Sequence, residues 1–312
     1  MTKMNKRLKI GLALGGGGVR GLANLGVLKV LEEENIPIDL IAGTSMGSVI
    51  GGGYALLGKA AILEEIILGL LESSTITKLE SLAAESRPEE KEMIIEGLAT
   101  FVKDLLLWNL KGIKRWIADG EEIKFLIKQI VGENEFSQTK IAFACVACDL
   151  KTGEEVILNT GKLKDAIMAS SSVPAVFPPM QLGGRLLVDG CVTSEVPIEA
   201  ARKLGVDFVI AGSVESRIYH DKFRNGMDIL FQADEIRSHE LVRIKLKMAD
   251  FIIQPKIEDI SWAAFSQAKI CIKAGETAAR QVLPCLKSSL RKKRYYSVFK
   301  RFFPRFSPKS SR

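Results

Sequence analysis

Short apolar runs alternate along this chain with longer segments of helical periodicity. The first run, residues 9–14, leads into a row of glycines, and leucines then recur every three residues at Leu22, Leu25, Leu28 and Leu31. A second apolar run follows Pro37 and ends at Ala42. A strand, a glycine loop, an amphipathic helix and a second strand in this order predict a βαβ unit with parallel strands.

The same alternation continues to the C-terminal region. Further strands are expected over residues 141–148, 155–159, 182–188, 208–211 and 251–254, with a hairpin turn at Gly183-Gly184. Further helices are expected over residues 46–57, most of 60–130, 163–170, 198–204, 229–246 and 263–283. This pattern predicts an α/β fold, a three-layer α/β/α sandwich with a central, mostly parallel sheet. The uncharged stretch 40–58 is expected to be a buried strand, turn and helix rather than a membrane span.

Charge is distributed unevenly between the body of the chain and its C-terminal end. Residues 288–312 contain nine of the 44 Lys and Arg residues and no acid, which leaves 35 basic against 37 acidic residues elsewhere. A nucleic-acid-binding domain would spread its basic charge over a folded face, so we exclude that class. We expect one domain over residues 1–287 and a basic, aromatic tail over 288–312 that is membrane-directed or disordered.

The pentapeptide Gly43-Thr44-Ser45-Met46-Gly47 matches the nucleophile elbow G-x-S-x-G. An apolar run precedes it and a helix-like run follows, which is the strand–turn–helix context that exposes the serine hydroxyl. The amino terminus of the following helix places partial positive charge beside an oxyanion formed there. Ser45 is therefore the candidate nucleophile.

The run GGGGVRG over residues 15–21 allows two interpretations. Gly16, Gly18 and Gly21 satisfy the dinucleotide fingerprint G-x-G-x-x-G, and Asp39 stands where a ribose-binding acid would lie. The same bare backbone N–H groups suit an oxyanion equally well. We favour the oxyanion interpretation because the next strand-to-helix turn carries Ser45, which has no role in dinucleotide binding.

A serine hydrolase also needs a base, and the sequence leaves two candidates. One is a triad in the order Ser45, Asp189 and His220, although His220 and His239, the two histidines, both stand in polar surroundings. The other is a dyad of Ser45 with Asp189, which ends the apolar run 186–188 and precedes Gly190.

The five cysteines include Cys145-x-x-Cys148 within an expected strand, where we expect buried apolar side chains rather than a metal site.

Four segments together resemble the patatin-like phospholipase family, and most of all its compact bacterial members: GGGGVRG, GTSMG, ASSSVPAVFPP and VDG, in the family's order between residues 9 and 211. The resemblance implies that Ser45 is the nucleophile, that Asp189 activates it without a histidine, and that Gly16, Gly17 and Gly18 form the oxyanion hole. It assigns supporting roles to Arg20, Gly43, Gly47 and Gly190, and it implies no metal or other cofactor. The chain departs from the family pattern at Cys191 and Glu195, and we expect Glu195 to raise the pKa of Asp189.

The resemblance implies a serine lipid acyl hydrolase that cleaves acyl esters of phospholipids or other membrane lipids through an acyl-enzyme. One alternative is another enzymatic activity, an acyltransferase or thioesterase that uses the same serine. The other alternative is a weakly catalytic, membrane-associated regulatory module. The aromatic and basic side chains of the tail predict attraction to an anionic membrane surface. We expect a cytoplasmic protein, peripheral on the inner membrane face, and an apolar stripe at residues 94–106 that packs on the core or forms a lid.

Overall fold

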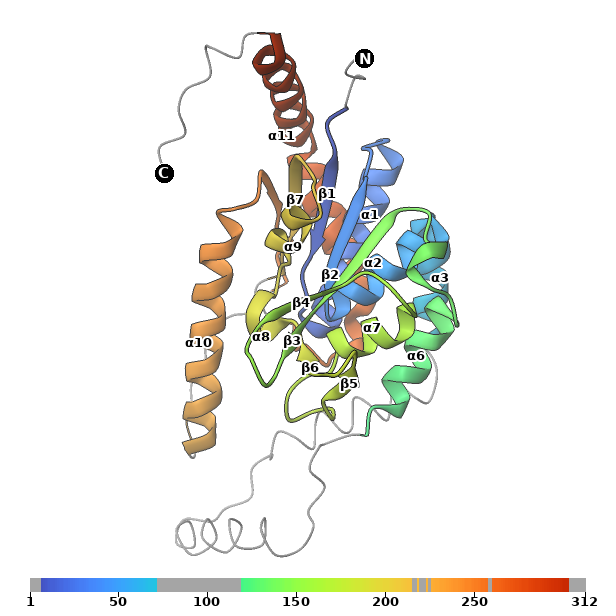
Figure 1. Ribbon diagram of the computed structural model, residues 1–312, viewed down its shortest axis with the longest axis vertical. Coiled ribbons are helices and arrows are strands. Elements are labelled where there is room, and N and C mark those ends of the chain that lie inside the picture. Colours follow the sequence, from blue (N-terminus) through green and yellow to red (C-terminus); the bar gives the residue numbers. More distant parts are fainter. Residues whose placement is uncertain are drawn as a thin grey trace, which may run out of the picture.

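The computed structural model describes residues 7–71, 119–214, 218, 223, 226–257 and 260–302 of the 312-residue chain. An eight-stranded sheet occupies its centre (Figure 1). Five neighbouring strands run parallel in the order β3-β2-β1-β7-β8, while β4 and β6 pair antiparallel with β3, and β5 pairs antiparallel with β6. The strands are β1 (Ile10–Leu14), β2 (Leu40–Thr44), β3 (Ala142–Asp149), β4 (Glu155–Leu158), β5 (Met180–Leu182), β6 (Arg185–Asp189), β7 (Phe208–Gly212) and β8 (Phe251–Ile253).

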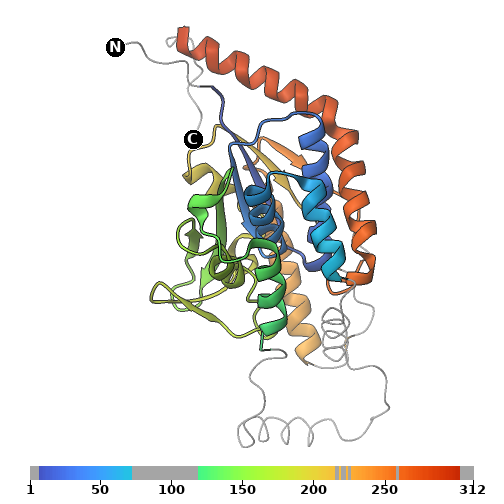
Figure 2. The same ribbon diagram turned by 90° about the vertical axis from the view of Figure 1, so that its right-hand side faces the viewer.

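Helices cover both faces of this sheet, as the two views in Figures 1 and 2 show. The larger core cluster joins one set of strand side chains, such as Leu12 and Ile41, to α1, α2, α3, α6, α7 and α11. A second cluster joins the alternate strand side chains, such as Ala13 and Ala42, to α9 and α10. Every residue of β1, β2 and β7 is buried, and all of them except Thr44 at the end of β2 are apolar or glycine, as is typical of strands covered on both faces. The predicted three-layer α/β/α sandwich is confirmed.

Most predicted helices lie close to their expected bounds, and α2 and α7 match them at both ends. The described α-helices are α1 (Ala23–Glu33), α2 (Met46–Leu57), α3 (Ala60–Leu71), α6 (Glu121–Val131), α7 (Leu163–Ser170), α8 (Cys191–Ser194), α9 (Ile198–Lys203), α10 (Gly226–Leu246) and α11 (Ala268–Phe302). The uncharged stretch 40–58 forms β2 and α2, as predicted. None of the helices in the described ranges is both long and apolar enough to cross a bilayer.

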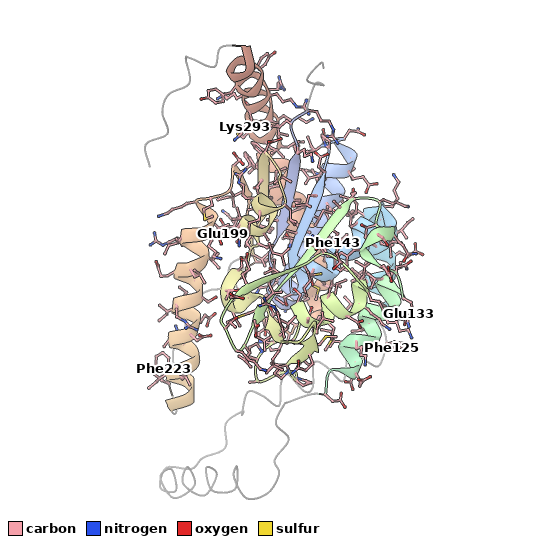
Figure 3. All side chains as sticks on the ribbon, in the orientation of Figure 1. Phe125, Glu133, Phe143, Glu199, Phe223 and Lys293 are labelled. Atoms are coloured by element: carbon pink, nitrogen blue, oxygen red, sulfur yellow. The ribbon has the colours of Figure 1, made fainter. Side chains whose placement is uncertain are left out.

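The last helix extends further than its sequence pattern indicates. Helix α11 continues across residue 287, where the expected domain boundary falls, and its Leu290 is buried in the larger core cluster. Lys293, labelled in Figure 3, donates to Asp250 at 2.9 Å. Residues 288–296 are therefore attached to the body. The apolar stripe at 94–106 and the chain beyond residue 302 lie outside the described residues.

Candidate active site

Ser45 lies in the sharp turn between β2 and α2. Its backbone has φ 53° and ψ −125°, in the left-handed region that non-glycine residues rarely occupy. Glycines on either side make this turn possible. A Cβ atom on Gly43 would come within 2.6 Å of the Ser48 Cα, and one on Gly47 would come within 2.6 Å of the Gly15 carbonyl oxygen. Strand and helix thus approach each other too closely for any side chain at these two positions.

Buried hydroxyl groups fix the elbow to the neighbouring elements. The Ser45 N–H donates to the Ser170 Oγ at 3.0 Å, and this hydroxyl donates in turn to the Val146 carbonyl at 2.6 Å. The Thr44 hydroxyl donates to the Ser194 carbonyl at 2.9 Å. Sequence reasoning did not single out Ser170, because a serine in an Ala-Ser-Ser-Ser run carries no individual signal. A fixed partner for the Ser45 N–H keeps the nucleophile at one position.

The sheet register brings Asp189 next to Ser45. Thr44 pairs with Val146, and Asp189 pairs with Ala147, so β2 and β6 end at neighbouring positions along β3. Gly190 fits this junction because a Cβ on it would come within 2.8 Å of the Val146 carbonyl carbon. Both candidate residues are buried, with 8% of Ser45 and 2% of Asp189 exposed. The structure therefore brings the two predicted catalytic residues together.

The Asp189 carboxyl group is only partly satisfied. Its Oδ1 accepts the Cys191 N–H at 2.8 Å, while Oδ2 is buried and has no hydrogen-bond partner among the described residues. Burial raises the pKa of Asp189 above its ordinary value, and the Cys191 N–H, the nearby Ser45 hydroxyl and the Cys191 thiol each lower it by less. The expectation that Glu195 raises this pKa is wrong in its cause, since burial dominates and Glu195 is not among the contributing groups.

The glycine loop lies at the carboxyl end of β1, against the elbow. The Gly16 N–H donates to the Glu195 carbonyl at 3.2 Å, and the Gly15 N–H donates to the Gly212 carbonyl at 2.9 Å. Gly17 and Gly18 have φ values of 102° and 59°, which favour glycine, and their N–H groups donate to no backbone carbonyl among the described residues. Gly16 itself packs closely, because a Cβ there would come within 3.0 Å of the Ser45 Cβ.

Arg20 holds the loop from the side of the short helix Gly18–Leu22. Its Nε donates to the Gly17 carbonyl at 3.4 Å. Burial lowers the pKa of Arg20, and the negative charges of Glu195 and Glu235 oppose this effect. A half-buried guanidinium among carboxylates that also contacts the loop backbone supports a structural role. Glu195 thus interacts with Arg20 through its charge and with Gly16 through its carbonyl.

The family model described as Patatin-like phospholipase matches residues 12–202, which include the glycine loop, Ser45 and Asp189. The chain belongs to the patatin-like phospholipase family. The match ends within α9, before β7 and the two long helices α10 and α11.

Several curated patatin-like and NTE family proteins share this region. A patatin-like phospholipase domain-containing protein of Caenorhabditis elegans is 33% identical over 217 residues, which make up 68% of this chain and 14% of that protein. An NTE family protein of Mycobacterium bovis is 31% identical over 206 residues, 66% of this chain and 49% of that protein. Lysophospholipase NTE1 of Meyerozyma guilliermondii is 26% identical and aligns with 90% of this chain and 20% of its own length. The chain spans less than half the length of each of these relatives.

Two other interpretations of the sequence find no support in this patatin-like structure. Asp39 precedes β2, where its carboxylate accepts the Ile10 N–H at 2.8 Å and binds Arg7. It lies at the amino ends of the strands, away from the glycine loop, so the dinucleotide interpretation does not hold.

His239 lies on α10 and takes part in none of the described hydrogen bonds of Ser45 or Asp189, while His220 lies outside the described residues. No three His, Cys, Asp or Glu side chains in the described ranges form a metal site.

An apolar cavity of the patatin-like fold reaches Met46, the residue that follows the nucleophile. It has a volume of about 70 Å³, and apolar side chains alone line it, from η1 (Gly18–Leu22), α2, α3, α6 and Phe265. Met46, which follows Ser45, forms part of its wall together with Leu22 and Val49. A cavity with such a lining favours apolar groups over polar ones.

Proposed function

We propose that this chain is a serine lipid acyl hydrolase in which Ser45 and Asp189 act as a catalytic dyad. One observation carries the proposal. Ser45 occupies a strained elbow beside a buried carboxyl group whose Oδ2 has no partner among the described residues. A buried acceptor without a donor is costly, and such strain and unsatisfied groups are typical of catalytic sites.

The reaction follows from the positions of these groups. The Ser45 Oγ attacks the ester carbonyl carbon and transfers its proton to the Asp189 Oδ2. The carbonyl oxygen gains the negative charge beside the Gly17 and Gly18 N–H groups, for which the described part of the chain provides no backbone acceptor. Collapse of this intermediate expels the alcohol, which takes the proton from Asp189 and leaves an acyl-Ser45. Water then attacks the acyl group with Asp189 as base, and collapse releases the fatty acid and restores Ser45.

The oxyanion hole in this proposal differs from the one expected from sequence. Gly16 was expected to donate along with Gly17 and Gly18, but its N–H already donates to the Glu195 carbonyl. We therefore assign the oxyanion to Gly17 and Gly18, and we assign Gly16 to the packing between the loop and the elbow.

Burial improves Asp189 as a base. A carboxylate with an ordinary pKa near 4 is a weak base at neutral pH, and a raised pKa brings it closer to the pH at which a general base works best. The apolar cavity beside Met46 supports a fatty acyl chain as the group that is transferred to Ser45. The family and its lysophospholipase relative support a phospholipid or lysophospholipid as the ester.

Three proteins test this proposal: the wild type, Ser45→Ala and Asp189→Asn. Each is incubated with a p-nitrophenyl ester, a phospholipid and a lysophospholipid, and Ser288→Ala on the exposed surface of α11 is the matched control. We expect kcat/KM to fall by about a thousandfold or more in both dyad variants and to be unchanged in the control. A fluorophosphonate should label the peptide that contains Ser45. Full activity in Ser45→Ala, or labelling elsewhere, would overturn the proposal.

We also propose that the end of α11 attracts the protein to anionic membranes and so places a cytoplasmic protein on the inner membrane face. Arg291 and Lys292 are exposed there, and Tyr295 is 77% exposed beside Tyr296. Cations and aromatic rings on one helix end suit an anionic lipid interface. Because Leu290 is buried in the core, charge reversal is a cleaner test than truncation.

The test compares Arg291→Glu plus Lys292→Glu with a matched reversal of Lys124 and Lys128 on α6. Phosphatidylcholine vesicles with and without phosphatidylserine are sedimented with each protein. Each basic residue at such a surface contributes on the order of 1 kcal/mol, so we expect the α11 variant to bind phosphatidylserine vesicles at least about tenfold more weakly. Equal binding by both variants would refute the proposal.

A further inference from the structure

The thiol of Cys191 lies at the meeting point of the glycine loop and the base. Cys191 begins α8, two residues after Asp189, and its backbone N–H donates to the Asp189 Oδ1 at 2.8 Å. Its Sγ packs against the loop so closely that a Cβ on Gly16 would come within 2.6 Å of it. The Gly17 N–H faces the sulfur, and the thiol faces the Asp189 carboxylate. One side chain therefore contacts both halves of the site.

The chemical state of this thiol determines what it can do. Burial, together with the negative charges of Asp189 and Glu195, raises the pKa of the Cys191 thiol well above its ordinary range. The group stays protonated at neutral pH, so it is a poor nucleophile but a hydrogen-bond donor. A protonated thiol beside a carboxylate donates to it, and its sulfur can accept weakly from a backbone N–H.

We infer that Cys191 is a positioning residue, whose thiol donates to Asp189 and whose sulfur accepts from the Gly17 N–H, so that the base and the oxyanion loop are held in one arrangement. This inference rests on the proposed function of Ser45 and Asp189. Sulfur is a weak acceptor, so the Gly17 N–H can leave it for a full negative charge when the tetrahedral intermediate forms. The donated S–H favours the ionised form of Asp189, the form that accepts the Ser45 proton.

Few groups act on the pKa of Asp189, so the contribution of the Cys191 thiol to this pKa can be measured. Burial is the largest influence on its pKa, and the groups that oppose burial come from the elbow, through the Ser45 hydroxyl, and from α8, through Cys191. Glu195, which follows α8, carries a charge that acts both on the Cys191 thiol and on Arg20 of η1. Loss of the thiol therefore removes one of the few donors to a buried carboxylate.

The test is the pH dependence of kcat/KM in Cys191→Ala and Cys191→Ser, with Cys285→Ala on the exposed face of α11 as the matched control. Alanine at position 191 removes the S–H donor to Asp189, and serine at the same position provides an O–H donor instead. We expect the acid limb of Cys191→Ala to move up by about one pH unit, so that kcat/KM relative to the variant's own high-pH plateau is about tenfold lower on the limb than in the wild type. Cys191→Ser should return the limb to its wild-type position. An unmoved limb in Cys191→Ala, or a Cys191→Ser profile that matches it, would overturn the inference.

A second readout separates this inference from the proposed function. In a Ser45→Ala background no turnover is needed, and the Asp189 carboxyl carbon is titrated by NMR with and without Cys191→Ala. A higher Asp189 pKa in the double variant supports the role of the thiol even where the wild type hydrolyses no ester. An identical pKa in the two proteins refutes it even where Ser45-dependent hydrolysis is fast.

Discussion

Replacement of Gly47 by alanine tests whether the elbow has any spare volume. The added Cβ would lie 2.6 Å from both the Gly15 carbonyl oxygen and the Leu14 carbonyl carbon. These are backbone atoms of β1 and the glycine loop, so no side-chain rotation relieves the clash. The Cβ would lie closer still to the Leu14 carbonyl oxygen, and the ordinary contact distance begins at 3.4 Å, so α2 must separate from β1 and the loop by at least about 0.8 Å.

Two effects of different size follow from this separation. Overpacking of a tight core costs about 1–3 kcal/mol, and we expect a loss of about 2 kcal/mol in the free energy of unfolding, or roughly 4 °C in Tm. Catalysis is more sensitive. Ser45 begins the helix that moves, and a misplacement of about 1 Å at a reacting centre costs on the order of a hundredfold in rate. We expect kcat to fall by about that factor.

Gly69→Ala is the matched control, because the same substitution there meets no atom within 4 Å. Gly69 is exposed in the last turn of α3, where alanine should stabilise the helix by up to about 0.5–1 kcal/mol and leave kcat unchanged. Tm by calorimetry and kcat on a p-nitrophenyl ester are measured for both variants. The reasoning fails if Gly47→Ala melts at or above the wild-type temperature, or if its kcat stays within twofold.

Three further outcomes follow from the site. Ser170→Ala removes the acceptor of the Ser45 N–H and a donor to the Val146 carbonyl, so unfolding should become about 1–3 kcal/mol easier and kcat should fall; unchanged values in denaturation and assay would contradict this. His220→Ala combined with His239→Ala should keep kcat within about twofold, whereas a large loss of ester hydrolysis would revive the triad. Because burial raises the pKa of Asp189, activity should disappear as the pH falls through a value above the ordinary 3.8, and a pH–rate profile with its limb below that value would be inconsistent.

The sequence was sufficient to predict the parts of the fold and site that depend on neighbouring residues. Uninterrupted apolar runs predicted β1, β2 and β7, since strands covered on both faces need no alternation. The elbow was predictable because G-x-S-x-G is a local motif, in which Gly43 packs against Gly47 and Ser48 of the same strand–turn–helix unit. The same reasoning predicted the hairpin of β5 and β6 at Gly183-Gly184, where both glycines have positive φ.

Features that depend on distant segments were not predictable from local pattern. Nothing near Ser170 indicates that its hydroxyl accepts the Ser45 N–H, which lies 125 residues earlier in the chain. Gly16 was expected to donate to the oxyanion, but its N–H donates to the carbonyl of Glu195, the residue that follows α8. Helix α11 was expected to end at residue 283, before Pro284, yet it continues because Leu286 and Leu290 pack on the core. The pattern of residues around one position does not show which distant segment packs against it or which residues of the two segments lie opposite each other.

The two proposals place lipid at opposite ends of helix α11, one at the Ser45 site and the other at the basic end of the helix. It begins near the glycine loop, where the Trp262 carbonyl accepts the Val19 N–H, and it runs to the opposite edge of the sheet, where Lys287 meets Glu34 and Lys293 meets Asp250. At 1.5 Å per residue, the 25 steps along the helix from Ala268 to Lys293 cover roughly 37 Å. A bilayer bound at the basic end would therefore lie at the amino ends of the strands, whereas Ser45 lies at their carboxyl ends. Such an enzyme would receive its substrate as a dispersed single-chain lipid or from an apposed second membrane, rather than extract it from the leaflet to which it is tethered.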